Sequence, residues 1–206
     1  MNGSRAPLPR RRLRGVRYGL AAVVAALMLS GCADQPDPLS QGPEGAAPAD
    51  GLTQVVELTA QRAGLAGQAA LAELDAGAPV PDPGADAAVV QEAAERAGVD
   101  RQWVARVVAD QVAASAQVRD GLLRQWAERP ESRPGGPADP ARVRGEFGRI
   151  DQELIAALAV AAPARVHEDC PASLAQAAVA QAEGLDDLHR GALGRGLTSV
   201  CDGTPD

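Results

Sequence analysis

The pattern of apolar and polar positions along residues 51–206 is that of helices. Within 101–128, apolar side chains recur every three or four residues, at Trp103, Val104, Val107, Val108, Val112, Val118, Leu122 and Trp126. This spacing places them on one face of an α-helix. Alternation of single apolar and polar positions, which is typical of a half-buried strand, hardly occurs. We therefore predict an all-α fold.

The same periodicity predicts five more helices, with breaks between them that are rich in proline and glycine. The expected helices are 51–74, 84–97, 101–128, 139–161, 171–183 and 185–200. Asp50 and Asp100 stand where N-caps are expected, Gly98 follows one helix, and Pro163 is expected to end another. We predict a bundle of six helices in which the three long ones form the core.

The first 31 residues predict export. They contain six arginines and no acidic residue, and an apolar run, Leu20–Leu29, precedes Ser30-Gly31-Cys32. A basic start, a short apolar middle and small residues before a cleavage point are typical of a signal peptide. The apolar run is too short to span a bilayer, which needs roughly 20 residues. The end of the segment resembles a lipobox, in which the thiol of Cys32 is acylated; a chance cysteine after an ordinary signal is the alternative.

Residues 32–50 contain four prolines and no apolar periodicity, so we predict a flexible tether between the lipid and one domain at 51–206. The protein is then expected outside the cytoplasm, held to the membrane by its lipid. Cys170 and Cys201 remain as a pair in an oxidising compartment. We expect them to form a disulfide that closes the final helical hairpin, worth about 3–4 kcal/mol in the chain-entropy description.

Charge and motif content narrow the function classes. The whole chain carries a formal charge of −7, and without residues 1–31 it has 14 arginines against 27 acidic residues, or −13. Such a domain should not bind nucleic acid, and an anionic ligand would need a local arginine cluster. His167 and His189 lack metal-ligand spacing, and no nucleophile, phosphate-loop or dinucleotide motif occurs. We expect neither a metal nor a cofactor.

Four segments resemble a known family: LTQVVELTAQRAGLAGQAALAE, PVPDP, GVDRQWVARVVADQVAASAQ, and LDDLHRGAL between the two cysteines. Together they are similar to the exported, disulfide-containing gamma class of AroQ-type chorismate mutases, over nearly the whole of 51–206. The resemblance implies an isomerase that converts chorismate to prephenate in one pericyclic step, as in aromatic amino acid biosynthesis. The substrate is a dianion whose ether oxygen gains negative charge, so fixed cations and a hydrogen-bond donor would catalyse the reaction.

The resemblance also implies site residues. The first-helix arginine of the family falls on Arg62 and the fourth-helix arginine on Arg144, and both would bind substrate carboxylates through their planar guanidinium groups. Ser115 falls on the small hydroxyl position of the long helix. A further arginine of the family falls on Ala85, where this chain has lost the cation.

Two more positions depart together. The family's lysine falls on Glu73, and the carboxylate or amide that faces it falls on Arg119. We hypothesise a charge-swapped catalytic pair, with Arg119 as the donor to the ether oxygen and Glu73 orienting it. The alternative is an ordinary inter-helix ion pair of little energetic worth.

Two other functions stay open. One is a catalytically degenerate relative that binds a small anion or a protein partner in the cell envelope. The other is a structural envelope lipoprotein, in which Arg62 and Arg144 would be surface residues that cover apolar flanks and lie too far apart to share a ligand. An exposed alanine-rich face could support a homodimer, and the sequence leaves the oligomeric state undecided.

Overall fold

The computed structural model of the chain describes residues 48–203. The segments predicted as signal peptide and tether, with Cys32, lie outside the described residues except for the last three positions of the predicted tether. Those residues form six α-helices and two short 3-10 helices: α1 (Pro48–Ala76), η1 (Pro83–Ala85), α2 (Ala87–Ala97), α3 (Arg101–Glu128), η2 (Pro130–Ser132), α4 (Pro140–Arg165), α5 (Cys170–Gln181) and α6 (Asp187–Gly196). The predicted all-α fold is confirmed, with the helix expected at 84–97 divided into η1 and α2.

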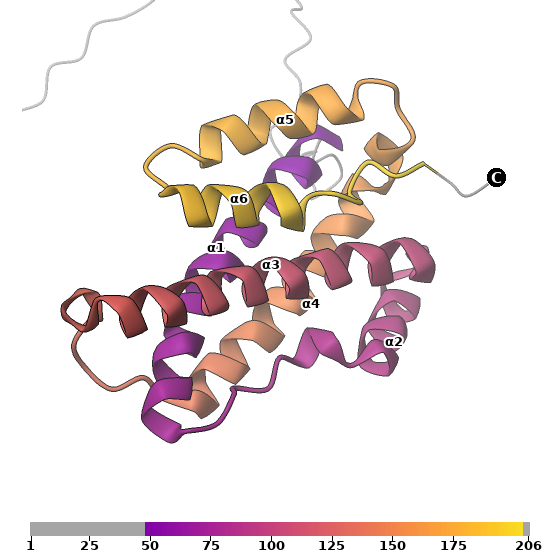
Figure 1. Cartoon of the computed structure of the whole chain (residues 1–206). Helices are drawn as coiled ribbons and strands as arrows, with labels where there is room; N and C mark the ends of the chain where they lie inside the picture. The colour runs from indigo at the N-terminus through magenta and orange to yellow at the C-terminus, as the bar shows by residue number, and fades with distance from the viewer. Residues whose placement is uncertain (1–47, 204–206) are drawn as a thin grey trace, which may run out of the picture. The chain divides into compact units, whose positions relative to one another are not determined.

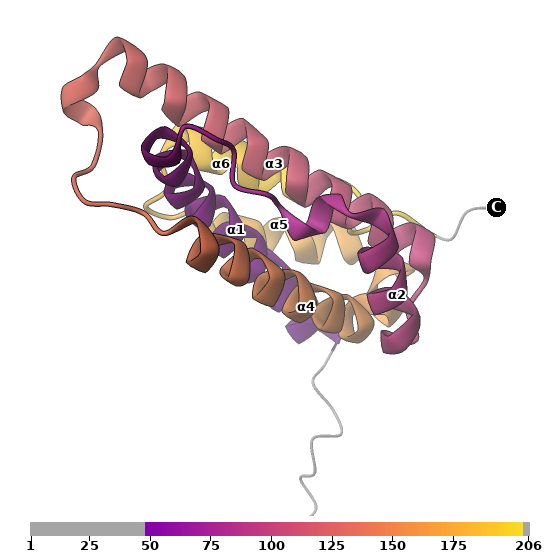
Figure 2. The same ribbon diagram turned by 90° about the horizontal axis from the view of Figure 1, so that it is seen from below.

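The three long helices form the core, as predicted. α1 packs along α4, and the two lie side by side in Figure 2. α3 lies across them, with α5 and α6 on one side of it and η1 and α2 on the other (Figure 1). Fully buried side chains from all three, such as Val56, Trp103 and Leu154, fill the space between the helices. Their burial supplies most of the stabilisation of a fold with so few aromatic residues.

Aspartates begin several helices by capping free backbone amides. The side chain of Asp86 accepts a hydrogen bond from Ala88 N at the start of α2, and that of Asp139 accepts one from Ala141 N at the start of α4. Asp100 caps α3 in the same way through the amides of residues 102 and 103. These side chains satisfy donors that have no partner inside the helix. The cap at Asp100 therefore sets the start of α3 at Arg101.

The predicted end of the fourth helix was wrong. α4 continues to Arg165 and contains Pro163 in its last turn. A proline there costs one backbone hydrogen bond, but contacts with α3 hold the turn. Arg165 is buried, its guanidinium carbon lies 4.6 Å from the centre of the Trp103 ring, and it forms an ion pair with Asp100 at 3.4 Å. The last predicted helix, 185–200, is instead shorter than expected, since α6 ends at Gly196.

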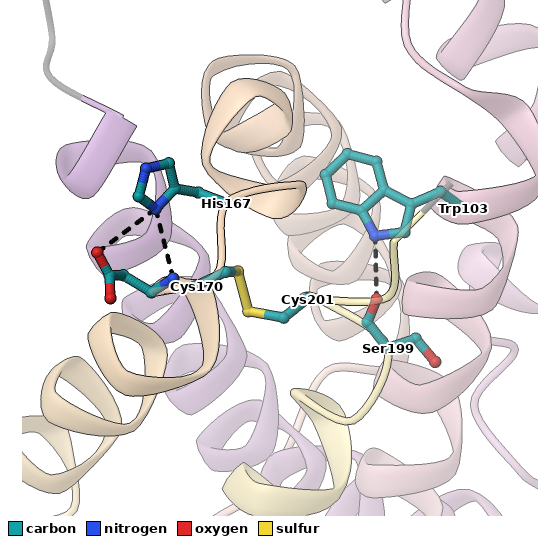
Figure 3. The surroundings of a disulfide bond; sticks show 6 residues. Trp103, His167, Cys170, Ser199 and Cys201 are labelled. Carbon is teal, nitrogen blue, oxygen red and sulfur yellow. Dashed lines mark hydrogen bonds and ion pairs between the residues drawn. A yellow bond between two sulfur atoms is a disulfide. The ribbon is translucent and has the colours of Figure 1, made fainter. Parts of the chain in front are cut away.

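The predicted disulfide is present and closes the α5–α6 hairpin. It joins Cys170, at the start of α5, to Cys201, after α6, with 5.8 Å between their Cα atoms. Nearby, the indole N–H of Trp103 donates to the carbonyl oxygen of Ser199 at 3.0 Å, so the same turn is also attached to α3 (Figure 3). Between residues 48 and 203, no helix is long and apolar enough to cross a membrane.

Candidate functional site

Arg62 lies at the centre of a buried group of charges. Its Nη1 donates to Asp151 Oδ1, and its Nη2 donates to both oxygens of Asp82, at 2.6 and 2.7 Å. The Phe147 ring covers one side of the guanidinium, with 4.9 Å from the guanidinium carbon to the ring centre. We call Arg62, Asp82 and Asp151 the Arg62 cluster. It connects α1, the segment before η1, and α4.

The Arg62 cluster contains two carboxylates and one cation. The Arg62 side chain is 1% exposed, that of Asp151 10%, and that of Asp82 18%. Burial raises the pKa of Asp151 to about 6; Arg62 opposes this shift, and the charge of Asp82 adds to it. Asp151 Oδ2 is buried and has no hydrogen-bond partner among the described residues. The carboxyl group of Asp151 therefore gains or loses its proton close to neutral pH.

A cavity of about 360 Å³ adjoins the Arg62 cluster, between η1, α2 and α3. Its ten lining residues are all Gly, Ala or Val: Gly84, Ala85, Ala87, Val90, Ala105, Val108, Ala109, Val112, Ala113 and Ala116. Gly84 separates the two, because a Cβ atom there would lie 3.0 Å from Arg62 Nη2 and 3.0 Å from Asp151 Oδ2. We call this space the η1–α3 cavity. It is apolar along its walls and has the buried charges behind one end.

The structure brings Glu73 and Arg119 together, as the sequence suggested. Arg119 Nε lies 3.6 Å from Glu73 Oε2, which links α1 to α3. Arg119 also donates to the neighbouring Asp120, at 3.0 and 3.1 Å. On α3, Arg119 follows Ala116 by three residues, so it continues the helix face that lines the η1–α3 cavity. The Glu73–Arg119 pair therefore lies beyond Ala116, which forms one end of the η1–α3 cavity.

Ser115 is buried, and its hydroxyl donates to the backbone carbonyl of Gln111 at 3.0 Å within α3. Arg144 is exposed near the start of α4. It precedes Asp151 by seven residues, or about 10 Å along the helix axis, on the same face as Phe147. In α4, Phe147 rather than Arg144 contacts the guanidinium of Arg62. The structure therefore places Arg62 and Arg144 on facing helices, one enclosed and one exposed.

Each predicted site arginine other than Arg144 faces two acids. Arg62 is paired with Asp82 and Asp151, and Arg119 lies beside Glu73 and Asp120. With all of these groups ionised, the two arginines are outnumbered by four carboxylates. A dianion would therefore enter against an unfavourable field unless acids are displaced or protonated. Among residues 48–203, no group of three or more His, Cys, Asp or Glu side chains could hold a metal ion.

Sequence reasoning missed Asp82, Asp151 and Phe147 as neighbours of Arg62. A signal for Asp151 was present, because it follows Phe147 by four residues and precedes Leu154 by three, on the apolar face of the fourth helix. A charged residue at a core-facing position requires a buried partner of opposite charge. The partner itself lies 89 residues away and follows only from the packing of α1 against α4.

The described residues form an all-α fold with an apolar cavity beside a group of charges, and similar proteins identify the family. No protein-family profile matches the sequence. A secreted chorismate mutase of Mycolicibacterium smegmatis is 27% identical over 155 residues, which cover 73% of this chain and 86% of that protein.

Two solved structures are similar over nearly their whole length. The chorismate mutase of Burkholderia thailandensis is 36% identical, with a TM-score of 0.67 over 73% of this chain and 99% of its own. That of Burkholderia phymatum is 31% identical, with a TM-score of 0.67 over 76% of this chain and 99% of its own. The chain belongs to the chorismate mutase family.

Proposed function

We propose that this protein is a chorismate mutase, converting chorismate to prephenate outside the cytoplasm. The observation that carries the proposal is the 36% identity to a solved chorismate mutase of which the chain covers 99%. A secreted relative, the basic and apolar segment at 1–31 and the disulfide all support an oxidising compartment outside the cytoplasm. We further propose the gamma class of the family, with residues 1–31 as signal peptide, lipid on Cys32 and a tether over 32–50.

The η1–α3 cavity is the proposed place of the substrate ring. Its volume of about 360 Å³ lies within the usual range for small-ligand pockets. Walls of Gly, Ala and Val suit the carbon faces of the substrate ring and restrict its conformations, which is what a one-step rearrangement needs. One substrate carboxylate would reach Arg62, which lies behind Gly84, and the other would reach Arg144 on α4.

At the other end of the η1–α3 cavity, Arg119 would donate to the ether oxygen as the C–O bond breaks. Arg119 carries several N–H donors on a fixed plane, and Glu73 at 3.6 Å would orient that plane. Ser115 lies one helical turn before Arg119 and would complete the polar end of the site. The reaction needs no proton transfer and no covalent intermediate, so these residues act by position and charge.

Arg62 would have to change partners to hold a carboxylate. Both of its terminal nitrogens already donate to carboxylates. Asp82 is the more exposed of the two acids and stands in the segment that leads into η1, beside the η1–α3 cavity. We propose that a substrate carboxylate takes the place of Asp82 on Nη2.

The roles of Arg119 and Glu73 are tested by turnover, followed as the loss of chorismate absorbance by the oxidised protein. Arg119→Gln should lower kcat by about 10²–10³, the usual effect of removing one charge-stabilising donor. Glu73→Gln should lower kcat less, because it loosens the donor without removing it. Arg124→Gln, an exposed arginine on the same helix, is the matched control and should leave kcat unchanged. Full activity of both site variants would remove the pair from the mechanism.

A further inference from the structure

The Arg62 cluster has one carboxylate more than its cation can neutralise. Asp82 places both oxygens on Nη2, whereas Asp151 has only Oδ1 on Nη1. Its Oδ2 is buried without a hydrogen-bond partner among the residues described. An ionised oxygen enclosed in this way is unfavourable, because it has lost water and gained nothing in exchange. Asp151 is therefore the member of the cluster that takes up a proton most readily.

The surroundings of Asp151 leave few other groups that could affect its charge. Arg62 faces it from α1, and Asp82 faces it from the segment before η1. α2 also packs against α4, and the buried side chains of α2 are Val90 and Ala94. The buried polar residues of α3 are a glutamine and a serine, which do not titrate in the accessible range. Burial raises the pKa of Asp151 to about 6, so its charge changes near neutral pH.

We infer that Asp151 sets the positive charge that Arg62 presents to an anionic substrate, so that binding of the dianion is accompanied by a proton on Asp151. The inference rests on the proposed function and makes Asp151 a positioning residue, since it acts through Arg62. With both acids ionised, the Arg62 cluster has a net charge of −1 and repels an anion. A proton from solvent neutralises Asp151 and leaves Asp82 as the one carboxylate to be displaced. By linkage, Asp151 holds that proton more tightly once the dianion is bound to Arg62.

The first test is the dependence of KM on pH between 5.5 and 8, a range in which the substrate carboxyl groups stay ionised. In the wild-type protein, KM for chorismate should be flat below about pH 6 and rise by about tenfold in total between pH 6 and 8, as the protonated fraction of Asp151 falls. Asp151→Asn carries no charge at this position, so its KM should not change with pH. Glu153→Gln, an exposed acid two residues further along α4, should follow the wild type. A wild-type KM that is flat, or a rise that persists in Asp151→Asn, overturns the inference.

The second test separates this inference from the proposed activity and uses the unaltered protein. The carboxyl carbon of Asp151 is followed by ¹³C NMR against pH, with and without an excess of chorismate or the prephenate formed from it. The titration midpoint of Asp151 should rise by about one pH unit when the dianion is added. A raised midpoint without turnover supports the proton-linked anion site and refutes the isomerase. Turnover with an unmoved midpoint refutes the inference and leaves the isomerase standing.

Discussion

The raised pKa of the buried Asp151 carboxyl predicts how the stability of the ligand-free protein depends on pH. Its pKa is about 6 in the folded protein, against 3.8 for the free group. Between these two values, the folded state binds the proton more tightly than the unfolded state does. The contribution of Asp151 to stability is therefore present at low pH and is lost as the pH rises through about 6.

The size of the effect follows from the shift. A change of one pKa unit corresponds to about 1.4 kcal/mol, so the full loss is about 3 kcal/mol, of which about 2 kcal/mol falls between pH 4.5 and 7.5. Asp100 and Asp186 have lowered pKa values because backbone amides donate to them, and they shift the free energy of unfolding in the opposite sense. A comparison with Asp151→Asn removes these contributions, since both proteins contain them.

The assay is urea unfolding of the oxidised wild type, Asp151→Asn and Glu153→Gln at pH 4.5 and 7.5. Urea is preferred to guanidinium chloride because it does not screen charges. The free energy of unfolding of the wild type, taken relative to Asp151→Asn, should fall by about 2 kcal/mol between the two pH values, and Glu153→Gln should follow the wild type. If the wild type and Asp151→Asn change equally with pH, the carboxyl titrates normally, and the account of the Arg62 cluster is refuted.

Two further predictions concern stability at neutral pH. Arg62→Met leaves the two carboxylates of the Arg62 cluster, Asp151 buried and Asp82 partly buried, without a cation. It should lower the free energy of unfolding by about 3–5 kcal/mol, measured in urea; a loss below about 1 kcal/mol would show that the cluster is not a buried ion network. The double change Cys170→Ala and Cys201→Ala opens a loop with a sequence separation of 31 residues. It should lower the free energy of unfolding by about 3–4 kcal/mol, and a melting temperature equal to that of the wild type would contradict this.

The helices of this fold could be predicted from the sequence because their signals are local. The start of α3 follows from the cap at Asp100, and its buried face follows from apolar spacing. The end of α4 could not be predicted, because Pro163 signals a stop that Arg165 overrides through its contacts with Trp103. Such contacts join residues about 60 positions apart and leave no trace in the local pattern.

The candidate site could be predicted only in part. Glu73 and Arg119 were expected to meet, and the structure places them 3.6 Å apart, whereas their catalytic role stays a prediction. The acids around Arg62 were missed because their positions depend on how α1, η1 and α4 pack. The η1–α3 cavity was missed as well, since alanines that line a cavity look the same in sequence as alanines that fit helices together.

Filling the η1–α3 cavity tests most directly whether the protein converts chorismate there. Val112 lines the cavity from α3, so Val112→Phe places a ring in it without altering a charged group. Val179→Phe, at a position on α5 that is 71% exposed, makes the same exchange away from the cavity. We predict that the oxidised wild type and Val179→Phe convert chorismate well above the uncatalysed rate, and that Val112→Phe, folded by circular dichroism, does not. No turnover by the folded wild type, or equal turnover by all three proteins, would contradict the account.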